Sequence, residues 1–91
     1  MSRKRAMKHI EENWTVKPER AAEFFSSLPE CDSLGNGCYG WDDCLIQVRK
    51  APDRQVGNLR FPAMMLDIQG PPEQADAVYH QFKMRFLSVG G

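Results

Sequence analysis

Residues 43–69 constrain the fold of this chain more than any other segment, because apolar and outward-facing positions alternate along two long runs. The apolar side chains on one face of these runs are Cys44, Ile46, Val48, Met64, Leu66 and Ile68. A period of two places successive side chains on opposite faces of a β-strand. We therefore expect residues 43–69 to form a long hairpin, which commits the chain to a sheet.

The connection between the two runs contains two turn signals. Ala51-Pro52-Asp53-Arg54 suits a turn with Pro at its second position, and Gly57-Asn58 closes the connection. Leu59 and Phe61 occupy odd positions, whereas the apolar residues after Pro62 occupy even ones. One inserted residue, a β-bulge, produces such a change of phase, and Pro is tolerated at a bulge or on an edge strand. We expect the hairpin to be bent at this point.

A helix is predicted before the hairpin and another after it. Pro18 suits a first helical position, and Pro29 ends a stripe of apolar residues with helical spacing: Ala21, Phe24, Phe25 and Leu28. After Gly70-Pro71-Pro72, apolar residues recur at intervals of three and four: Ala75, Val78, Tyr79, Phe82, Phe86 and Val89. Gly90 is then a natural C-terminal cap. In residues 82–89, the apolar side chains of Phe82, Met84 and Phe86 also alternate with the basic Lys83 and Arg85, so a final strand is the competing prediction there.

The remaining segments complete a β-α-β-β-α order. Residues 8–16 fit either a strand or a helix, and we favour a strand because Asn13-Trp14-Thr15-Val16 suits a pleated surface. Residues 30–42 are rich in small side chains and predict a loop with a turn at Asn36-Gly37. The expected fold is a small α+β sandwich, with helices on one face of a mainly antiparallel sheet that contains the long bent hairpin. We expect a single domain over residues 8–91, preceded by a basic N-terminal arm over residues 1–7.

The formal net charge of zero conceals a division along the chain. Residues 1–8 carry four bases and no acid, whereas residues 9–43 carry eight acids and two bases. A nucleic-acid-binding domain usually has a basic balance or a long basic stripe, and neither is present. We therefore expect a solvated basic arm and regard nucleic-acid binding as unlikely. The alternative is a weak nucleic-acid binder that uses the arm together with Arg49, Lys50, Arg54 and Arg60.

Cysteine usage and the N-terminal sequence bear on the cellular compartment. The basic start is followed by Lys8, Glu11 and Glu12 without an apolar segment, so we expect no signal peptide. No apolar run approaches the length of a membrane helix, and we expect no membrane partner. Three cysteines in such a chain are expected to be reduced thiols in the cytoplasm.

Neither a metal site nor a catalytic site is expected. Cys31, Cys38 and Cys44 are spaced too widely for the close pair that is typical of zinc sites, and His9 and His80 lie far away in sequence. We predict no bound metal and no cofactor, and keep a metal or ligand site on the Cys31/Cys38 loop as an alternative. The sequence contains no nucleophile–base motif and no phosphate loop, which favours a protein that is not an enzyme.

The best candidate for binding is the aromatic segment Tyr39, Trp41, Asp42 and Asp43, where Gly37 and Gly40 allow tight turns. Trp and Tyr are favoured anchors at binding surfaces, and the two carboxylates could receive a cationic or polar ligand. The alternative is that both rings fold inward and cap the core.

The C-terminal residues Val89-Gly90-Gly91 resemble the Gly-Gly terminus of ubiquitin-like sulfur carriers. That resemblance covers three residues and implies activation of Gly91 as a thiocarboxylate. In those carriers a strand leads into the tail, whereas the segment before Val89 favours a helix here.

Together these observations predict a small, non-catalytic binding or regulatory protein that contacts another protein or a small ligand. Three strands and two helices leave one sheet face or edge uncovered, which favours a homodimer. A chain of this size and class is also typical of proteins encoded on mobile elements.

Overall fold

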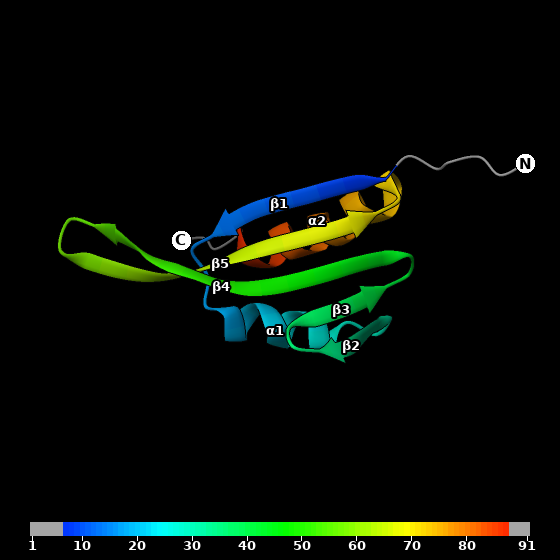
Figure 1. Ribbon diagram of the computed structural model, residues 1–91, viewed down its shortest axis with the longest axis horizontal. Helices are drawn as coiled ribbons and strands as arrows, with labels where there is room; N and C mark the ends of the chain where they lie inside the picture. Colours follow the sequence, from blue (N-terminus) through cyan, green and yellow to red (C-terminus); the bar gives the residue numbers. More distant parts are fainter. Residues whose placement is uncertain (1–6, 88–91) are drawn as a thin grey trace, which may run out of the picture.

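The computed structural model describes residues 7–87, and Figure 1 shows their arrangement. The elements in chain order are β1 (Lys8–Trp14), α1 (Pro18–Ser27), β2 (Cys31–Gly35), β3 (Cys38–Trp41), β4 (Cys44–Val56), β5 (Leu59–Gly70) and α2 (Pro72–Phe86). The strands form one sheet in the order β1-β5-β4-β3-β2, and every neighbouring pair is antiparallel. The predicted α+β class is confirmed.

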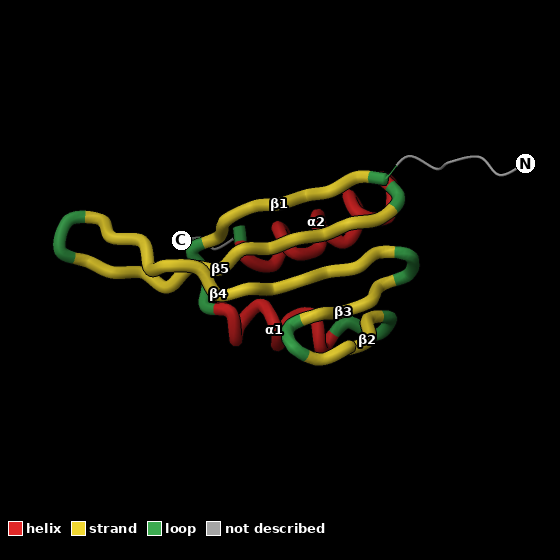
Figure 2. Tube along the Cα trace, viewed as in Figure 1, coloured by secondary structure: helices red, strands yellow, loops and turns green. Residues whose placement is uncertain are grey.

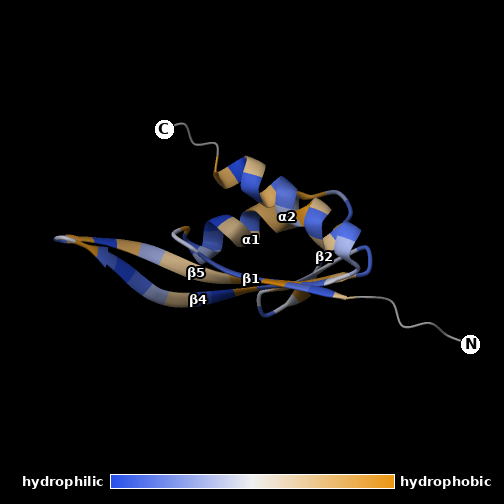
Figure 3. Ribbon diagram, turned by 90° about the horizontal axis from the view of Figure 1, so that it is seen from above, coloured by the Kyte–Doolittle hydropathy of each residue, from blue (hydrophilic) through white to orange (hydrophobic). Residues whose placement is uncertain are grey.

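The sheet has one covered face and one open face. Figure 2 shows that the β4–β5 hairpin is longer than the other strands and projects past them. Both helices lie on the same side of the sheet, which the view of Figure 3 shows from its edge. The strand side chains that face the helices are fully or almost fully buried: Ile10, Tyr39, Cys44, Ile46, Val48, Met64, Leu66 and Ile68.

Aromatic rings join the two helices to each other and to the sheet. Phe25 of α1 stacks on Phe82 of α2 with ring centroids 5.7 Å apart, and Trp14 of β1 meets Phe82 edge-on at 5.0 Å. Phe24 and Phe86 extend this cluster towards the ends of the helices. Phe25 and Phe82 have no exposed surface, so they contribute most to the hydrophobic burial between the layers.

The predicted strand over residues 8–16 and both predicted helices are confirmed. β1 pairs with β5 over its whole length because Ile10 and Trp14 then point towards the helices. α1 begins at Pro18, whose missing N–H costs nothing at a first helical position. α2 buries Ala75, Val78 and Phe82, which recur at helical spacing, and it continues to Phe86 where a strand was the alternative.

Residues 30–42 were expected to form a loop, and this expectation is wrong. They form a small hairpin, β2–β3, around the predicted turn at Asn36-Gly37. Both turn residues have positive φ, and a Cβ on Gly37 would lie 2.6 Å from the carbonyl oxygen of Val48. β2 escaped prediction because all of its residues except Cys31 are exposed, so no apolar alternation marks it.

The turn expected at residues 51–54 is also absent, since β4 runs through them to Val56 and the chain reverses only at Gly57-Asn58. The expected irregularity is present, but the extra residue lies in β4: Ala51 pairs with Ala63, and Arg54 pairs with Phe61. Pro52 is tolerated there because β4 has no further strand on its outer edge at this point.

Three expectations fall outside the described residues: the basic side chains at positions 3–5, the Gly90 cap and the terminal Val89-Gly90-Gly91. Within residues 7–87, neither helix is both long enough and apolar enough to span a membrane.

Candidate functional site

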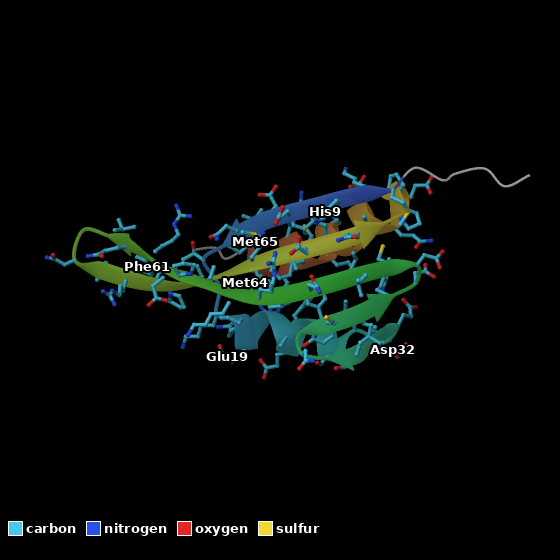
Figure 4. All side chains as sticks on the ribbon, in the orientation of Figure 1. His9, Glu19, Asp32, Phe61, Met64 and Met65 are labelled. Atoms are coloured by element: carbon cyan, nitrogen blue, oxygen red, sulfur yellow. The ribbon has the colours of Figure 1, made fainter. Side chains whose placement is uncertain are left out.

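The open face of the sheet carries polar side chains in rows that run across the strands. Glu11, Asp67, Gln47 and Cys38 are register partners on β1, β5, β4 and β3, and His9 lies in the next row opposite Gln69. Figure 4 labels His9 and, further along the same face, Met65. An antiparallel sheet with one covered and one solvated face commonly shows this pattern.

Asp67 is the exception on this face, because it is buried with 4% of its surface exposed. His9 Nε2 lies 2.8 Å from Asp67 Oδ1, and Arg49 donates from Nη2 to Asp67 Oδ2 at 2.5 Å. Arg49 Nη2 also lies 3.6 Å from Glu11 Oε2. These four side chains form an ion-pair network, in which half-exposed His9 and Arg49 cover the buried carboxylate.

The network shifts the titration of its central carboxyl. Burial by itself raises the pKa of Asp67, but the hydrogen bonds from His9 and Arg49 and the charges of these two groups outweigh burial. The net pKa of Asp67 is therefore lower than its ordinary value. Asp67 thus favours the ionised form, which the hydrogen bonds from His9 and Arg49 stabilise.

Within the described part of the chain, His9, Glu11 and Asp67 present one donor atom each within 4.8 Å of one another, a spacing that a metal ion could bridge. The Arg49 guanidinium occupies the same cluster and already binds Asp67. A fixed positive charge at this distance opposes a divalent cation, since two like charges in one site repel strongly. We therefore interpret the cluster as an ion-pair network that orders the open face.

The cysteines do not converge. Cys38 pairs with Gln47 of the open face, whereas Cys31 pairs with Trp41 and packs against the core on the helix side. Cys44 is buried beneath Gly70. Burial, followed by the charges of neighbouring acids, raises the pKa of both the Cys31 and the Cys44 thiol, which disfavours the thiolate needed for metal binding or nucleophilic attack.

The four residues predicted to bind a ligand are divided between the core and the surface. Tyr39 is 5% exposed and packs on Phe25, with ring centroids 5.6 Å apart, so its ring belongs to the core. Trp41 is half-buried against the same core. Asp42 and Asp43 are exposed in the turn between β3 and β4, where the backbone N–H of Asp43 donates to Gln74 Oε1 at 3.0 Å. A binding role for this turn stays a prediction.

The feature that the sequence analysis did not identify as a site is the free part of the β4–β5 hairpin, residues 52–61, which we call the arm. β1 pairs with β5 only as far as Met64, and β3 pairs with β4 only as far as Gln47. The two strands of the arm therefore pair with each other and with no other described strand. The arm leaves the body of the sheet as a two-stranded ribbon (Figure 2).

The two sides of the arm differ in polarity. Val56 pairs with Leu59, and Arg54 pairs with Phe61, so these four side chains share one side. Val56 and Leu59 are each 60% exposed and Phe61 is 38% exposed. The other side presents Gln55 and Arg60. We call the side with Val56, Leu59 and Phe61 the apolar side of the arm.

Two hollows adjoin the arm. One of about 360 Å³ lies between Thr15 and the apolar side, lined by Arg54, Val56 and Phe61. The other, of about 630 Å³, lies between the start of α1 and the base of the arm. Its charged lining residues are of both signs: Lys17, Glu19, Arg20, Glu23, Lys50 and Asp53. The first hollow is the one that places exposed apolar side chains beside open space.

Neither a comparison with protein-family models nor a search of curated proteins finds a match for this chain.

Proposed function

We propose that this chain is a non-catalytic binding or regulatory protein that acts through protein–protein contacts of the arm. The observation that carries the proposal is the exposure of Val56 and Leu59, 60% each, on one side of a ribbon that projects from the body. Clustered apolar side chains on a protruding element, next to Arg54, match the composition of protein interfaces better than that of solvated loops.

The energetics of a ribbon support the same proposal. A two-stranded hairpin is marginally stable in water unless a third element covers one of its sides. No other described element pairs with the arm, and its register sets Val56 opposite Leu59 and Arg54 opposite Phe61 on a side that remains in solvent. A partner that covers the apolar side would stabilise the arm and remove this surface from water.

The distribution of aromatic rings favours a protein partner over a nucleic acid. Single-stranded nucleic acids stack their bases on exposed aromatic side chains. In residues 7–87, the aromatic side chains other than Phe61 contribute to the packed core or its margin on the helix side. The open face carries Glu11 and Asp67 beside Arg49 and His9, so its charges are mixed and do not form the basic stripe that is typical of nucleic-acid binding.

We place the protein in the cytoplasm. The support for this location is the set of three free thiols at Cys31, Cys38 and Cys44, of which Cys44 is buried and the other two are partly buried. Unpaired cysteines of this kind are typical of a reducing compartment.

Site-specific photo-cross-linking tests the proposed contact surface. A benzophenone amino acid is introduced at Val56 on the apolar side or, as a matched control, at the adjacent Gln55 on the opposite side. After irradiation of cells that express the full chain, we expect a covalent protein adduct from position 56 and little or none from position 55. Equal yields from both positions, or no adduct from position 56, would contradict the proposal. The mass of the adduct distinguishes a second copy of the chain from another protein.

A further inference from the structure

We propose that the partner of the arm is a second copy of this chain, which receives the apolar side of the arm on an acid-flanked patch at the far end of the sheet. This inference rests on the proposed function. It adds the identity of the partner and the surface that the arm occupies. The patch consists of Leu34, Gly40 and Leu45, with Asp32 beside them.

The patch is an exposed apolar surface on the open face. Gly40 of β3 pairs directly with Leu45 of β4, and Cδ1 of Leu34 lies 3.7 Å from the position that a Cβ on Gly40 would take. Leu34 and Leu45 therefore lie beside Gly40 on the same face of the sheet. Leu34 is 59% and Leu45 is 42% exposed, so this surface is as open to solvent as the apolar side of the arm.

The charges beside the two surfaces are complementary. Residues 30–48 carry four acidic side chains and no basic one, and Asp32 lies next to the patch as the other register partner of Gly40. Residues 50–61 carry three basic side chains and one acidic one, with Arg54 on the apolar side itself. Opposite charges around apolar centres favour this pairing and oppose arm-to-arm or patch-to-patch contacts, in which like charges would meet.

The arm cannot reach the patch of its own chain. Both surfaces include β4, which carries Leu45 near its start and Val56 at its end. An extended strand advances about 3.3 Å per residue, so roughly 35 Å separates the two surfaces along a continuous strand. Figure 4 labels Phe61 and Asp32 towards opposite ends of the molecule. Only another copy can bring an arm to this patch.

Two copies can satisfy both contacts at once. In a pair related by a two-fold axis, the arm of each copy lies on the patch of the other, so one closed dimer contains two identical contacts. The doubled contact compensates for the small area of each, because the second contact forms within an already assembled pair. We therefore expect a dimer and not an open chain of copies.

Charge reversal in matched variants tests the pairing. The arm variant carries Arg54→Glu, and the patch variant carries Asp32→Lys. Sedimentation of the full chain, from micromolar to hundreds of micromolar, is expected to show a wild-type dimer. Each variant alone should dimerise at least about tenfold more weakly, because like charges then meet at both contacts. A mixture of the two variants should again dimerise, because each contact regains opposite charges.

A control variant carries Arg85→Glu on α2, which changes the net charge by the same amount as the arm variant, and it should dimerise like the wild type. Circular dichroism spectra should show that all variants fold. A wild type that remains monomeric would overturn the inference, as would variants that dimerise normally, a mixture that stays monomeric or an open-ended polymer. An adduct from position 56 with a different protein would also overturn it while supporting the proposed function.

Discussion

The same two strands, β4 and β5, carry both fully buried and largely exposed apolar side chains. In the body of the sheet, where α1 and α2 cover them, Ile46, Met64 and Leu66 have no exposed surface. In the arm, only a few residues further along, Val56 and Leu59 keep 60% of their surface exposed. Apolar side chains alternate in both parts, and both belong to one antiparallel hairpin.

The difference shows that alternation determines which side of a strand a residue occupies and not whether that side is covered. Each square ångström of apolar surface removed from water stabilises a fold by about 25 cal/mol, and this contribution requires a neighbouring layer. The helices provide that layer for the body. The arm extends beyond them, so its apolar side chains contribute little to folding and remain available for a partner.

The largest expected effect contrasts a phenylalanine of the body with one of the arm. Phe82→Ala removes a fully buried ring that stacks on Phe25 and meets Trp14, so it should destabilise the fold by about 3–5 kcal/mol. Phe61→Ala removes a ring that is 38% exposed and should cost less than about 1 kcal/mol. Urea denaturation of both variants measures the difference, and similar losses would contradict the contrast between body and arm.

A smaller effect is expected where strands meet beneath α2. A Cβ at Gly70 would lie 2.5 Å from Cys44 Sγ and 2.9 Å from its Cα, so Gly70→Ala should destabilise the fold by about 1–3 kcal/mol. Gly40→Ala is the matched control, because the nearest atom to its Cβ would be Leu34 Cδ1 at an ordinary 3.7 Å. Thermal unfolding should show a Tm lowered by several degrees for the first variant only. An unchanged Tm for Gly70→Ala would show that the body tolerates overpacking.

The smallest effect concerns the open face of the body, which is ordered by ion pairs. Asp67→Asn should cost about 1 kcal/mol at neutral pH, because the half-exposed partners His9 and Arg49 can turn to water. The folded-state pKa of Asp67 lies below its ordinary value of 3.8, so its stabilisation is present above pH 3.8 and is lost as the pH falls through the folded-state pKa. The free energies of unfolding of the wild type and the variant should therefore converge in acid. If the difference in the free energy of unfolding between wild type and variant did not shrink as the pH fell below 3.8, the Asp67 carboxylate would be excluded as its source.

Parts of the fold could be predicted because each has a local cause. The helix starting at Pro18, the helix that buries Phe82 and the pairing of residues 44–50 with residues 64–69 follow from periodicity and turn residues. The β2–β3 hairpin could not be recognised as two strands because β2 places almost no apolar side chain in the core. The turn at Asn36-Gly37 was its one local signal.

The arm and the network around Asp67 could not be predicted in the same way. Pro52 and Asp53 suit a turn, but the strand continues through them because β3 does not pair with β4 here, so the missing N–H of Pro52 leaves no ladder bond unmade. His9 lies 58 residues from Asp67, and Arg49 lies 18 residues from it. No local pattern relates such positions, since only the register of β1, β5 and β4 brings them together.

The sequence by itself determined the class of the fold, the side of each long strand that faces the helices and the neutral balance of acidic and basic segments. The tertiary structure decided where the helices end relative to the hairpin, and hence which apolar residues are core and which form the apolar side of the arm. It also placed acidic and basic surfaces at opposite ends of β4. Burial depends on which elements meet in space, and that depends on contacts between residues far apart in the chain.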